Sequence, residues 1–195
     1  MKKALIISGS PRLNGDTASM IEHFKKNFKG ETEILQTYPQ LNPNAPKACT
    51  DCRGCIKHKG CILKDDFSKF IADDYDFLVI ASPLYMSNLT PPLWNIISRF
   101  NYVFNNKKHL NIKTEFKEKV GALFLAGGGG TCKILMGQSN EENAVKEAKY
   151  IFSKLNANFE ENIVCSLNTN NLPFADDETA KSKIIEIANK FNALL

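Results

Sequence analysis

The feature that most constrains the fold is an alternation of short apolar runs with longer amphipathic segments along the 195 residues. The clearest run, at 76–81, is continuously apolar after its first residue, as in a strand that is covered on both faces. We expect strands at 3–8, 31–37, 76–81, 119–126 and 159–166. We expect helices at 17–29, 65–73, 92–104, 140–155 and 176–195. Strands that alternate with helices build a parallel sheet between two helical layers, so the sequence predicts an α/β fold.

The composition excludes several other classes of protein. Hydrophobic residues make up 43% and charged residues 24%, close to the globular average, which excludes a disordered or collagen-like chain. The net charge is +4 without a basic stripe, so we expect no nucleic-acid partner. No apolar run approaches the ~20 residues of a membrane span, and the first one is too short for a signal peptide. We therefore expect a cytoplasmic protein without a membrane partner, folded as one domain over residues 1–195.

A polar turn follows the first expected strand and leads into the first expected helix. Its hydroxyls, amide and guanidinium come from Ser8, Ser10, Arg12, Asn14 and Thr17. The free N–H groups and the dipole of the helix point at this turn, which suits a phosphate. The glycine-rich dinucleotide and P-loop patterns are absent, so a phosphate held by hydroxyls suggests a mononucleotide such as FMN. The alternative is an ordinary polar turn that caps the helix.

Two further segments follow the third and fourth expected strands. Residues 83–88 read PLYMSN and offer a rigid turn, an apolar face and an aromatic ring for stacking; the alternative is a buried hydrophobic turn. Four glycines at 127–130 let the backbone approach a ligand, and their N–H groups can stabilise negative charge; the alternative is a flexible loop without a ligand. Ligands of such sheets bind beyond the carboxyl ends of the strands.

In this order, the three segments resemble those of the flavodoxin-like NAD(P)H-dependent FMN reductases. Ser-Gly-Ser-Pro-Arg at 8–12 is similar to the FMN phosphate loop of that family, and Ser-Pro-x-Tyr at 82–85 to the segment along the isoalloxazine ring. The glycine run is similar to the loop at the pyrimidine end of the flavin. The resemblance spans roughly residues 1–135. It implies a three-layer αβα sandwich whose five-stranded parallel sheet has the order 2-1-3-4-5.

The resemblance implies an FMN-dependent oxidoreductase, with NAD(P)H or a redox protein as the electron donor and an unknown acceptor. It implies a homodimer or tetramer with FMN near the subunit interface. Hydride transfer requires no protein acid or base, so we expect no catalytic side chain. The alternative from another class is a non-enzymatic electron carrier like flavodoxin, although a pI of about 8.7 argues against it. The implied FMN-binding residues are Ser8, Ser10, Arg12, Asn14, Thr17, Pro83, Leu84, Tyr85, Met86, Asn88, Gly127, Gly128 and Gly129.

A long connection at 38–64 holds four of the six cysteines, Cys49, Cys52, Cys55 and Cys61, spaced C-x2-C-x2-C-x5-C. Loops of this length are usually functional or disordered, and clustered cysteines in a reducing compartment suggest metal or redox chemistry. The run resembles that of the iron–sulfur flavoproteins, a branch of the same family, and so implies a 4Fe–4S cluster close to the flavin. Zinc and metal-free thiols stay open as alternatives, although zinc ribbons pair two separated C-x2-C knuckles.

Overall fold

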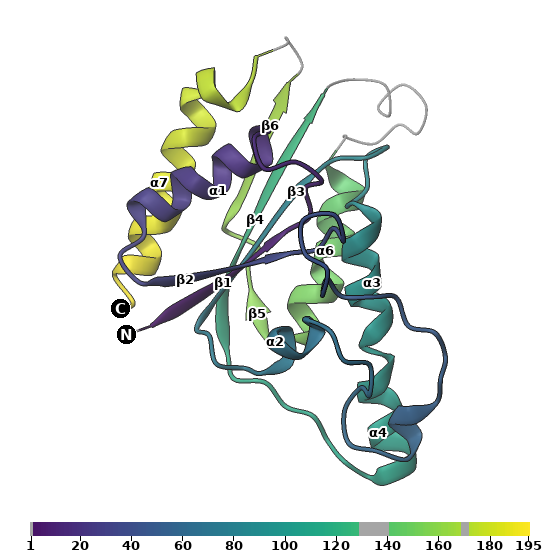
Figure 1. Cartoon of the computed structure of the whole chain (residues 1–195). Helices are drawn as coiled ribbons and strands as arrows, with labels where there is room; N and C mark the ends of the chain where they lie inside the picture. The colour runs from purple at the N-terminus through teal and green to yellow at the C-terminus, as the bar shows by residue number, and fades with distance from the viewer. Residues whose placement is uncertain (1, 129–140, 169–171) are drawn as a thin grey trace.

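A computed structural model describes residues 2–128, 141–168 and 172–195 (Figure 1). It contains one parallel sheet in the order β2-β1-β3-β4-β5, with β6 also paired to β4. This confirms the predicted α/β class and strand order. The strands are β1 (Lys3–Ser8), β2 (Glu31–Gln36), β3 (Phe77–Pro83), β4 (Lys119–Gly128), β5 (Ala157–Asn158) and β6 (Ile163–Asn168).

Helices cover both faces of the sheet (Figure 1). The helices α1 (Asp16–Asn27) and α7 (Glu178–Asn192) pack on one face, where Ile6 and Val79 belong to a buried core. On the other face, Ile7 and Ile80 pack in a second core under three helices, α2 (Phe67–Ile71), α3 (Pro91–Arg99) and α6 (Glu142–Lys154). Neighbouring strand residues point to opposite faces, so a strand buried on both must be apolar throughout.

The fifth position in the sheet differs from the prediction of one strand at 159–166. It is shared by two short strands, β5 and β6, which pair with successive parts of β4. Between them, Phe159 turns into the core and stacks on Phe152, with ring centroids 4.1 Å apart. Asn162 is buried, and its side-chain amide donates to the Gly121 carbonyl at 2.9 Å. The described residues therefore form six strands, because an irregular segment interrupts the fifth.

The helix predicted at 92–104 is also divided. It forms α3 and a second helix, α4 (Asn101–Leu110), on either side of Phe100. The Phe100 ring is buried and packs edge-on against Phe67, with centroids 5.6 Å apart. The second helix runs six residues beyond the prediction and ends at Asn111 in the left-handed conformation, with φ of 55°. Two single-turn 3-10 helices, η1 (Gly54–Ile56) and η2 (Phe174–Asp176), complete the described elements.

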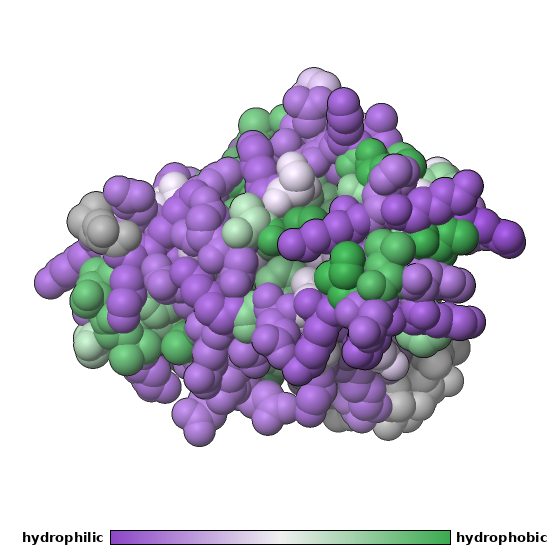
Figure 2. Space-filling view, turned by 90° about the horizontal axis from the view of Figure 1, so that it is seen from below, coloured by the Kyte–Doolittle hydropathy of each residue, from purple (hydrophilic) through white to green (hydrophobic). Residues whose placement is uncertain are grey.

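The surface is mostly polar. Seen from below, hydrophilic side chains surround separate hydrophobic patches (Figure 2). The exposed apolar side chains include Met86, Trp94 on α3 and Phe104 on α4. Over the described ranges, none of the helices combines the length and the apolar character needed to span a bilayer.

Candidate flavin site and cysteine pocket

Three segments meet in direct contact at Gly9, where β1 ends. The Gly9 N–H donates to the Ala81 carbonyl of β3 at 2.8 Å, and the Thr90 hydroxyl donates to the Gly9 carbonyl at 2.8 Å. A Cβ at Gly9 would lie 2.8 Å from both Thr90 Oγ1 and Leu93 Cδ1. A side chain at position 9 would displace Thr90 and Leu93, so Gly9 lets the turn after β1 lie against the end of β3 and the start of α3.

The turn after β1 presents positive charge at the start of α1. Ser10 is buried, and its Oγ accepts the Arg12 N–H at 3.2 Å and donates to the Arg12 carbonyl at 3.0 Å. The Arg12 guanidinium folds back, since a Cβ at Gly15 would lie 3.3 Å from its Nη2. Gly15 leaves the first N–H groups of α1 without a side-chain cap. The Asp16 carboxylate accepts the Phe174 N–H at 3.2 Å, so it is engaged elsewhere. Uncapped N–H groups beside a guanidinium favour an anion.

The other predicted residues of this segment occupy the same neighbourhood. Ser8 and Thr17 are buried, at the end of β1 and in the first turn of α1. Asn14 is exposed between them. The structure thus places all five predicted phosphate-loop residues on one strand–turn–helix connection. Their contacts with a phosphate stay a prediction.

The segment after β3 forms a tight turn with unusual backbone conformations. Tyr85 and Asn88 exchange both backbone hydrogen bonds at 3.0 Å. Between them, Met86 and Ser87 have φ of 51° and 66°, in the left-handed region that favours glycine. Such strain at non-glycine residues gathers at ligand-binding segments. Ser87 is buried, and within the described ranges its hydroxyl has no hydrogen-bond partner. An unpartnered buried hydroxyl beside an exposed tyrosine fits a flat ring with a polar edge, such as a flavin.

The third predicted flavin segment, the glycine run that begins at Gly127, lies directly beside this turn. Pro83 ends β3, and the Leu84 N–H donates to the Ala126 carbonyl of β4 at 2.8 Å. A Cβ at Gly127 would lie 3.1 Å from the Leu84 Cβ, so the glycine allows the strand ends to approach. Gly128 is the last residue of β4. The predicted Gly129 lies outside the described residues.

Two residues of this site, Tyr38 and Thr90, belong to none of the predicted flavin segments. Tyr38 follows β2 in the aperiodic connection, and burial raises the pKa of its phenol, with a further increase from Tyr85 beside it. Thr90 also hydrogen-bonds to Tyr38, which lowers that pKa in part. The ends of β1, β2 and β3 therefore bring Tyr38, Tyr85 and Thr90 together.

Glu147 of α6 contacts the segment after β3 from the helical layer that also contains α3. Its Oε2 accepts the Leu89 N–H at 2.7 Å, directly after the Tyr85–Asn88 turn. Burial raises the pKa of the Glu147 carboxyl, whereas the hydrogen bonds from Leu89 and Trp94 lower it in part. The carboxylate thus holds the turn from a helix 58 residues away in the chain.

We expect Glu147→Gln to change how stability depends on pH. The folded pKa of Glu147 lies above the ordinary value of 4.5, so its contribution is complete below pH 4.5 and is lost as the pH rises through the folded pKa. The free energy of unfolding of the variant should therefore rise relative to wild type between pH 4.5 and 7. Urea unfolding across this range measures the difference. If the free energies of unfolding of the two proteins change in parallel with pH, the raised pKa of Glu147 is wrong.

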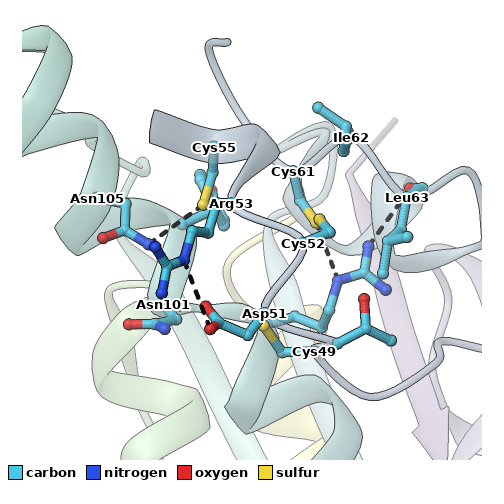
Figure 3. Close-up of a pocket in the computed structure, with 13 residues that line it drawn as sticks. Cys49, Asp51, Cys52, Arg53, Cys55, Cys61, Ile62, Leu63, Asn101 and Asn105 are labelled. Atoms are coloured by element: carbon cyan, nitrogen blue, oxygen red, sulfur yellow. Dashed lines mark hydrogen bonds and ion pairs between the residues drawn. The ribbon is translucent and has the colours of Figure 1, made fainter. Parts of the chain in front are cut away.

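The four predicted metal ligands, Cys49, Cys52, Cys55 and Cys61, line one cavity of about 20 Å³ (Figure 3). Cys49 and Cys52 are exposed, whereas Cys55 and Cys61 are half-buried. The cavity has room for about one water molecule. In the part of the chain that the structure describes, no three His, Cys, Asp or Glu side chains are grouped closely enough to hold a metal ion. The donor set suits an iron–sulfur cluster, but the thiols must move to surround one.

Arg99 forms hydrogen bonds to both ends of the cysteine segment, which runs over 47–63. Its guanidinium forms an ion pair with Asp65 at 2.7 Å, and both side chains are 1% exposed. It also donates to the Lys47 carbonyl at 3.1 Å and the Leu63 carbonyl at 3.4 Å. Its Nε donates to Cys61 Sγ at 3.1 Å. Arg99 thus organises the loop from the end of α3.

The helix that follows α3, α4, contacts the middle of the cysteine segment at 47–63. The Asn106 amide donates to the carbonyls of Cys55 at 2.6 Å and His58 at 3.0 Å, and its Oδ1 accepts the Gly60 N–H at 2.7 Å. The Asn105 amide donates to Cys55 Sγ at 3.3 Å. The nine residues of α3 separate this pocket from Thr90 by about 14 Å at 1.5 Å per residue. The connection therefore begins at Tyr38, beside Tyr85 and Thr90, and brings its cysteines to the far end of α3.

Two iron–sulfur flavoproteins of Archaeoglobus fulgidus are similar to this chain. One is 28% identical over 100 residues, which cover 50% of this chain and 44% of that protein. The other is 30% identical over 135 residues, which cover 64% of each. The matches thus span about half to two thirds of the length of these relatives.

Solved structures share the fold at low identity. An FMN-dependent NADH-azoreductase from Bacillus anthracis, in complex with FMN, has a TM-score of 0.62 at 17% identity and covers 98% of this chain and 100% of its own. An NAD(P)H:quinone oxidoreductase from Methanothermobacter marburgensis has a TM-score of 0.62 at 13% identity, with coverage of 97% and 94%. These likenesses confirm the flavodoxin-like fold.

The family predicted from the three segments is also found by direct comparison with family models. The model of the NADPH-dependent FMN reductases matches residues 2–137, which include all three predicted flavin segments and the cysteine loop. The chain belongs to the NADPH-dependent FMN reductase family.

Proposed function

We propose that the protein is an FMN-dependent oxidoreductase that takes electrons from NAD(P)H or a redox protein and passes them to a further acceptor. The observation that carries the proposal is the meeting at Gly9 of the turn after β1, the end of β3 and the start of α3. Arg12 and the uncapped N–H groups of α1 stand beside this junction. The FMN reductase family of the chain supports the same chemistry.

The chain's own residues bind and orient the flavin. Arg12 and the first N–H groups of α1 would hold the phosphate, and the Tyr85–Asn88 turn would hold the ring. Backbone N–H groups of Gly127 and Gly128 would stabilise negative charge on the flavin. When bound, FMN supplies the hydride chemistry. The protein contributes orientation, electrostatics and exclusion of water, and it needs no acid or base.

We also propose that Cys49, Cys52, Cys55 and Cys61 ligate one 4Fe–4S cluster. All four line one cavity, and thiolates favour iron–sulfur clusters or zinc over harder cations. When bound, such a cluster supplies one-electron transfer. The names of the Archaeoglobus relatives support this assignment. A cluster-free FMN reductase is the second candidate, because the described side chains do not already form a metal site.

Flavin, iron and sulfide analysis of anaerobically purified protein tests these proposals together. A yellow protein that NADH or NADPH bleaches supports the enzyme. A yellow protein that only ferredoxin or dithionite bleaches supports an electron carrier instead. A colourless protein that contains zinc would contradict both proposals.

We expect Cys55→Ala and Cys61→Ala to lose iron and cluster absorbance after anaerobic reconstitution while they keep FMN. The reason is that these cysteines lie about one helix length from the flavin segments. Cys165→Ala, which changes a half-buried cysteine of β6, is the matched control and should keep both. If wild-type protein takes up no iron, the cluster-free reductase is correct.

The subunit interface is proposed to include the outer side of α3 and α4. Trp94 of α3 and Phe104 of α4 are exposed by 43% and 62%, and exposed aromatic side chains on two successive helices favour a homodimer or tetramer. We expect Phe104→Glu to dissociate the assembly, because association would bury a charge. Sedimentation velocity of wild type and variant measures this. A monomeric wild type would contradict the proposal.

A further inference from the structure

The residue at which the long connection begins, Tyr38, has a fixed backbone. Thr37 before it is buried, and both its N–H and its hydroxyl donate to the Ser8 carbonyl, at 3.1 Å and 2.8 Å. The Tyr38 carbonyl in turn accepts the N–H groups of Leu41 and Asn42, both at 3.0 Å. The end of β2 is thus bound to the end of β1, and the Tyr38 side chain starts from a rigid turn.

The Tyr38 phenol joins two groups of the candidate flavin site. It forms side-chain hydrogen bonds with the Tyr85 phenol and with the Thr90 hydroxyl. Thr90 is fully buried at the start of α3, and its Oγ1 donates to the Gly9 carbonyl at 2.8 Å. A continuous chain of hydrogen bonds therefore runs from Tyr85 through Tyr38 and Thr90 to the junction at Gly9.

Tyr85 belongs to a turn that does not by itself fix the orientation of its ring. Its backbone exchanges two hydrogen bonds with Asn88, and the residues between them, Met86 and Ser87, adopt left-handed conformations. The Tyr85 side chain is 44% exposed. A side chain this exposed keeps rotational freedom unless a partner restricts it, and a ligand that requires one rotamer binds more weakly for that reason. The hydrogen bond with Tyr38 supplies the restriction.

We propose that Tyr38 is a positioning residue of the flavin site, which holds the Tyr85 ring in the orientation that stacks on the isoalloxazine. The inference rests on the FMN site proposed above, and it does not depend on the metal content of the cysteine segment. A ring that is oriented before FMN arrives loses no rotamer freedom on binding, so this preorganisation raises the affinity. Tyr38 acts through Tyr85 and need not touch the flavin. The long connection thereby contributes to the flavin site at its first residue.

Tyr38→Phe provides the test, because it removes the shared hydroxyl and keeps the ring. Fluorescence titration of the flavin-free protein with FMN gives the affinity. The emission of bound FMN reports the stacking, since a tyrosine ring stacked on a flavin quenches its fluorescence. We expect the affinity for FMN to fall about fivefold, the size of one ordinary hydrogen bond, and the emission of bound FMN to rise. The affinity for riboflavin should fall by the same factor, because riboflavin has the same ring without the phosphate.

Two further variants and one reporter locate the effect. If Tyr38 acts through Tyr85, the double variant Tyr38→Phe, Tyr85→Phe should bind FMN as Tyr85→Phe alone does, because the two hydroxyls share one hydrogen-bond chain. Tyr150→Phe removes the hydroxyl of an exposed tyrosine on α6 and should bind FMN like wild type. Trp94 is the single tryptophan of the chain and lies in α3, so its emission in flavin-free protein reports the packing around the start of that helix.

The outcomes separate this inference from the proposed function. Wild-type protein that binds no FMN would overturn the FMN site itself. Wild type that binds FMN, with equal affinity and emission in Tyr38→Phe, would overturn the positioning role and leave the site in place. A loss confined to FMN would overturn it too, because the effect would then lie at the phosphate turn. Additive losses in the double variant, or altered Trp94 emission in flavin-free Tyr38→Phe, would also overturn it, since Tyr38 would then contact the flavin directly or only support the fold.

Discussion

Arg99→Met is expected to destabilise the protein by about 3–5 kcal/mol, because it leaves the buried Asp65 carboxylate without its ion-pair partner. Asp65 would keep only N–H donors, from Lys47 at 3.0 Å and Phe67 at 3.1 Å. The change also removes the contacts of Arg99 with the carbonyls at both ends of the cysteine segment. Chemical unfolding in urea measures the loss, and limited proteolysis should show cleavage at 47–63 first.

Two controls distinguish the buried pair from a general effect of removing charge. Lys146→Met breaks an exposed pair with Glu142 on α6 and should cost less than about 1 kcal/mol. The double variant Arg99→Met, Asp65→Leu removes both buried charges and should be more stable than Arg99→Met alone. A loss below about 1 kcal/mol in Arg99→Met would mean that water reaches Asp65.

Ser10→Ala combined with Arg12→Ala is expected to weaken FMN binding by roughly 10-fold to 150-fold. The charge-assisted contact contributes about 1.5–3 kcal/mol, and each ~1.4 kcal/mol is a factor of ten in affinity. Arg12 and Ser10 have different roles in the phosphate loop. Arg12 supplies the charge over the start of α1, whereas the Ser10 hydroxyl closes the turn through Arg12's backbone. Fluorescence titration of the flavin-free and metal-free protein with FMN measures the affinity for FMN.

Leu13→Ala is the matched control in the same turn, since Leu13 is 65% exposed and brings neither charge nor a hydrogen-bonding group. It should bind FMN like wild type. Riboflavin lacks the phosphate, so wild type should bind it poorly and the double variant should bind it equally poorly. Equal FMN affinity in the double variant and wild type would remove the phosphate-loop assignment.

Local pattern was sufficient for the order of the elements, and it singled out the three segments that lie together at the strand ends. The run at 77–81 is apolar at successive positions, as expected for a strand buried on both faces. The turn after β1 carries its own signals, since hydroxyls and Arg12 lie next to the start of a helix. Such signals are contained within about ten residues, so the sequence displays them directly.

Interruptions of elements could not be derived in the same way. The segment at 159–166 reads as one strand, yet Phe159 stacks on Phe152 and the fifth position of the sheet divides there. The region at 92–104 reads as one helix, yet burial of Phe100 against Phe67 separates α3 from α4. In both places a partner distant in the chain outweighs the local preference.

The sequence by itself indicated the α/β class through its hydrophobic periods, and its short motifs carried the resemblance that implied the family and the strand order. Which residues contact the flavin stays a prediction. Only the tertiary structure decided that Glu147 holds the turn at Leu89, that Arg99 pairs with Asp65, and that two asparagines of one helix differ at the cysteine pocket. These contacts join residues 34 to 58 positions apart. No local period records them, since they exist only once the layers have packed and brought distant polar groups within hydrogen-bond distance in a buried setting.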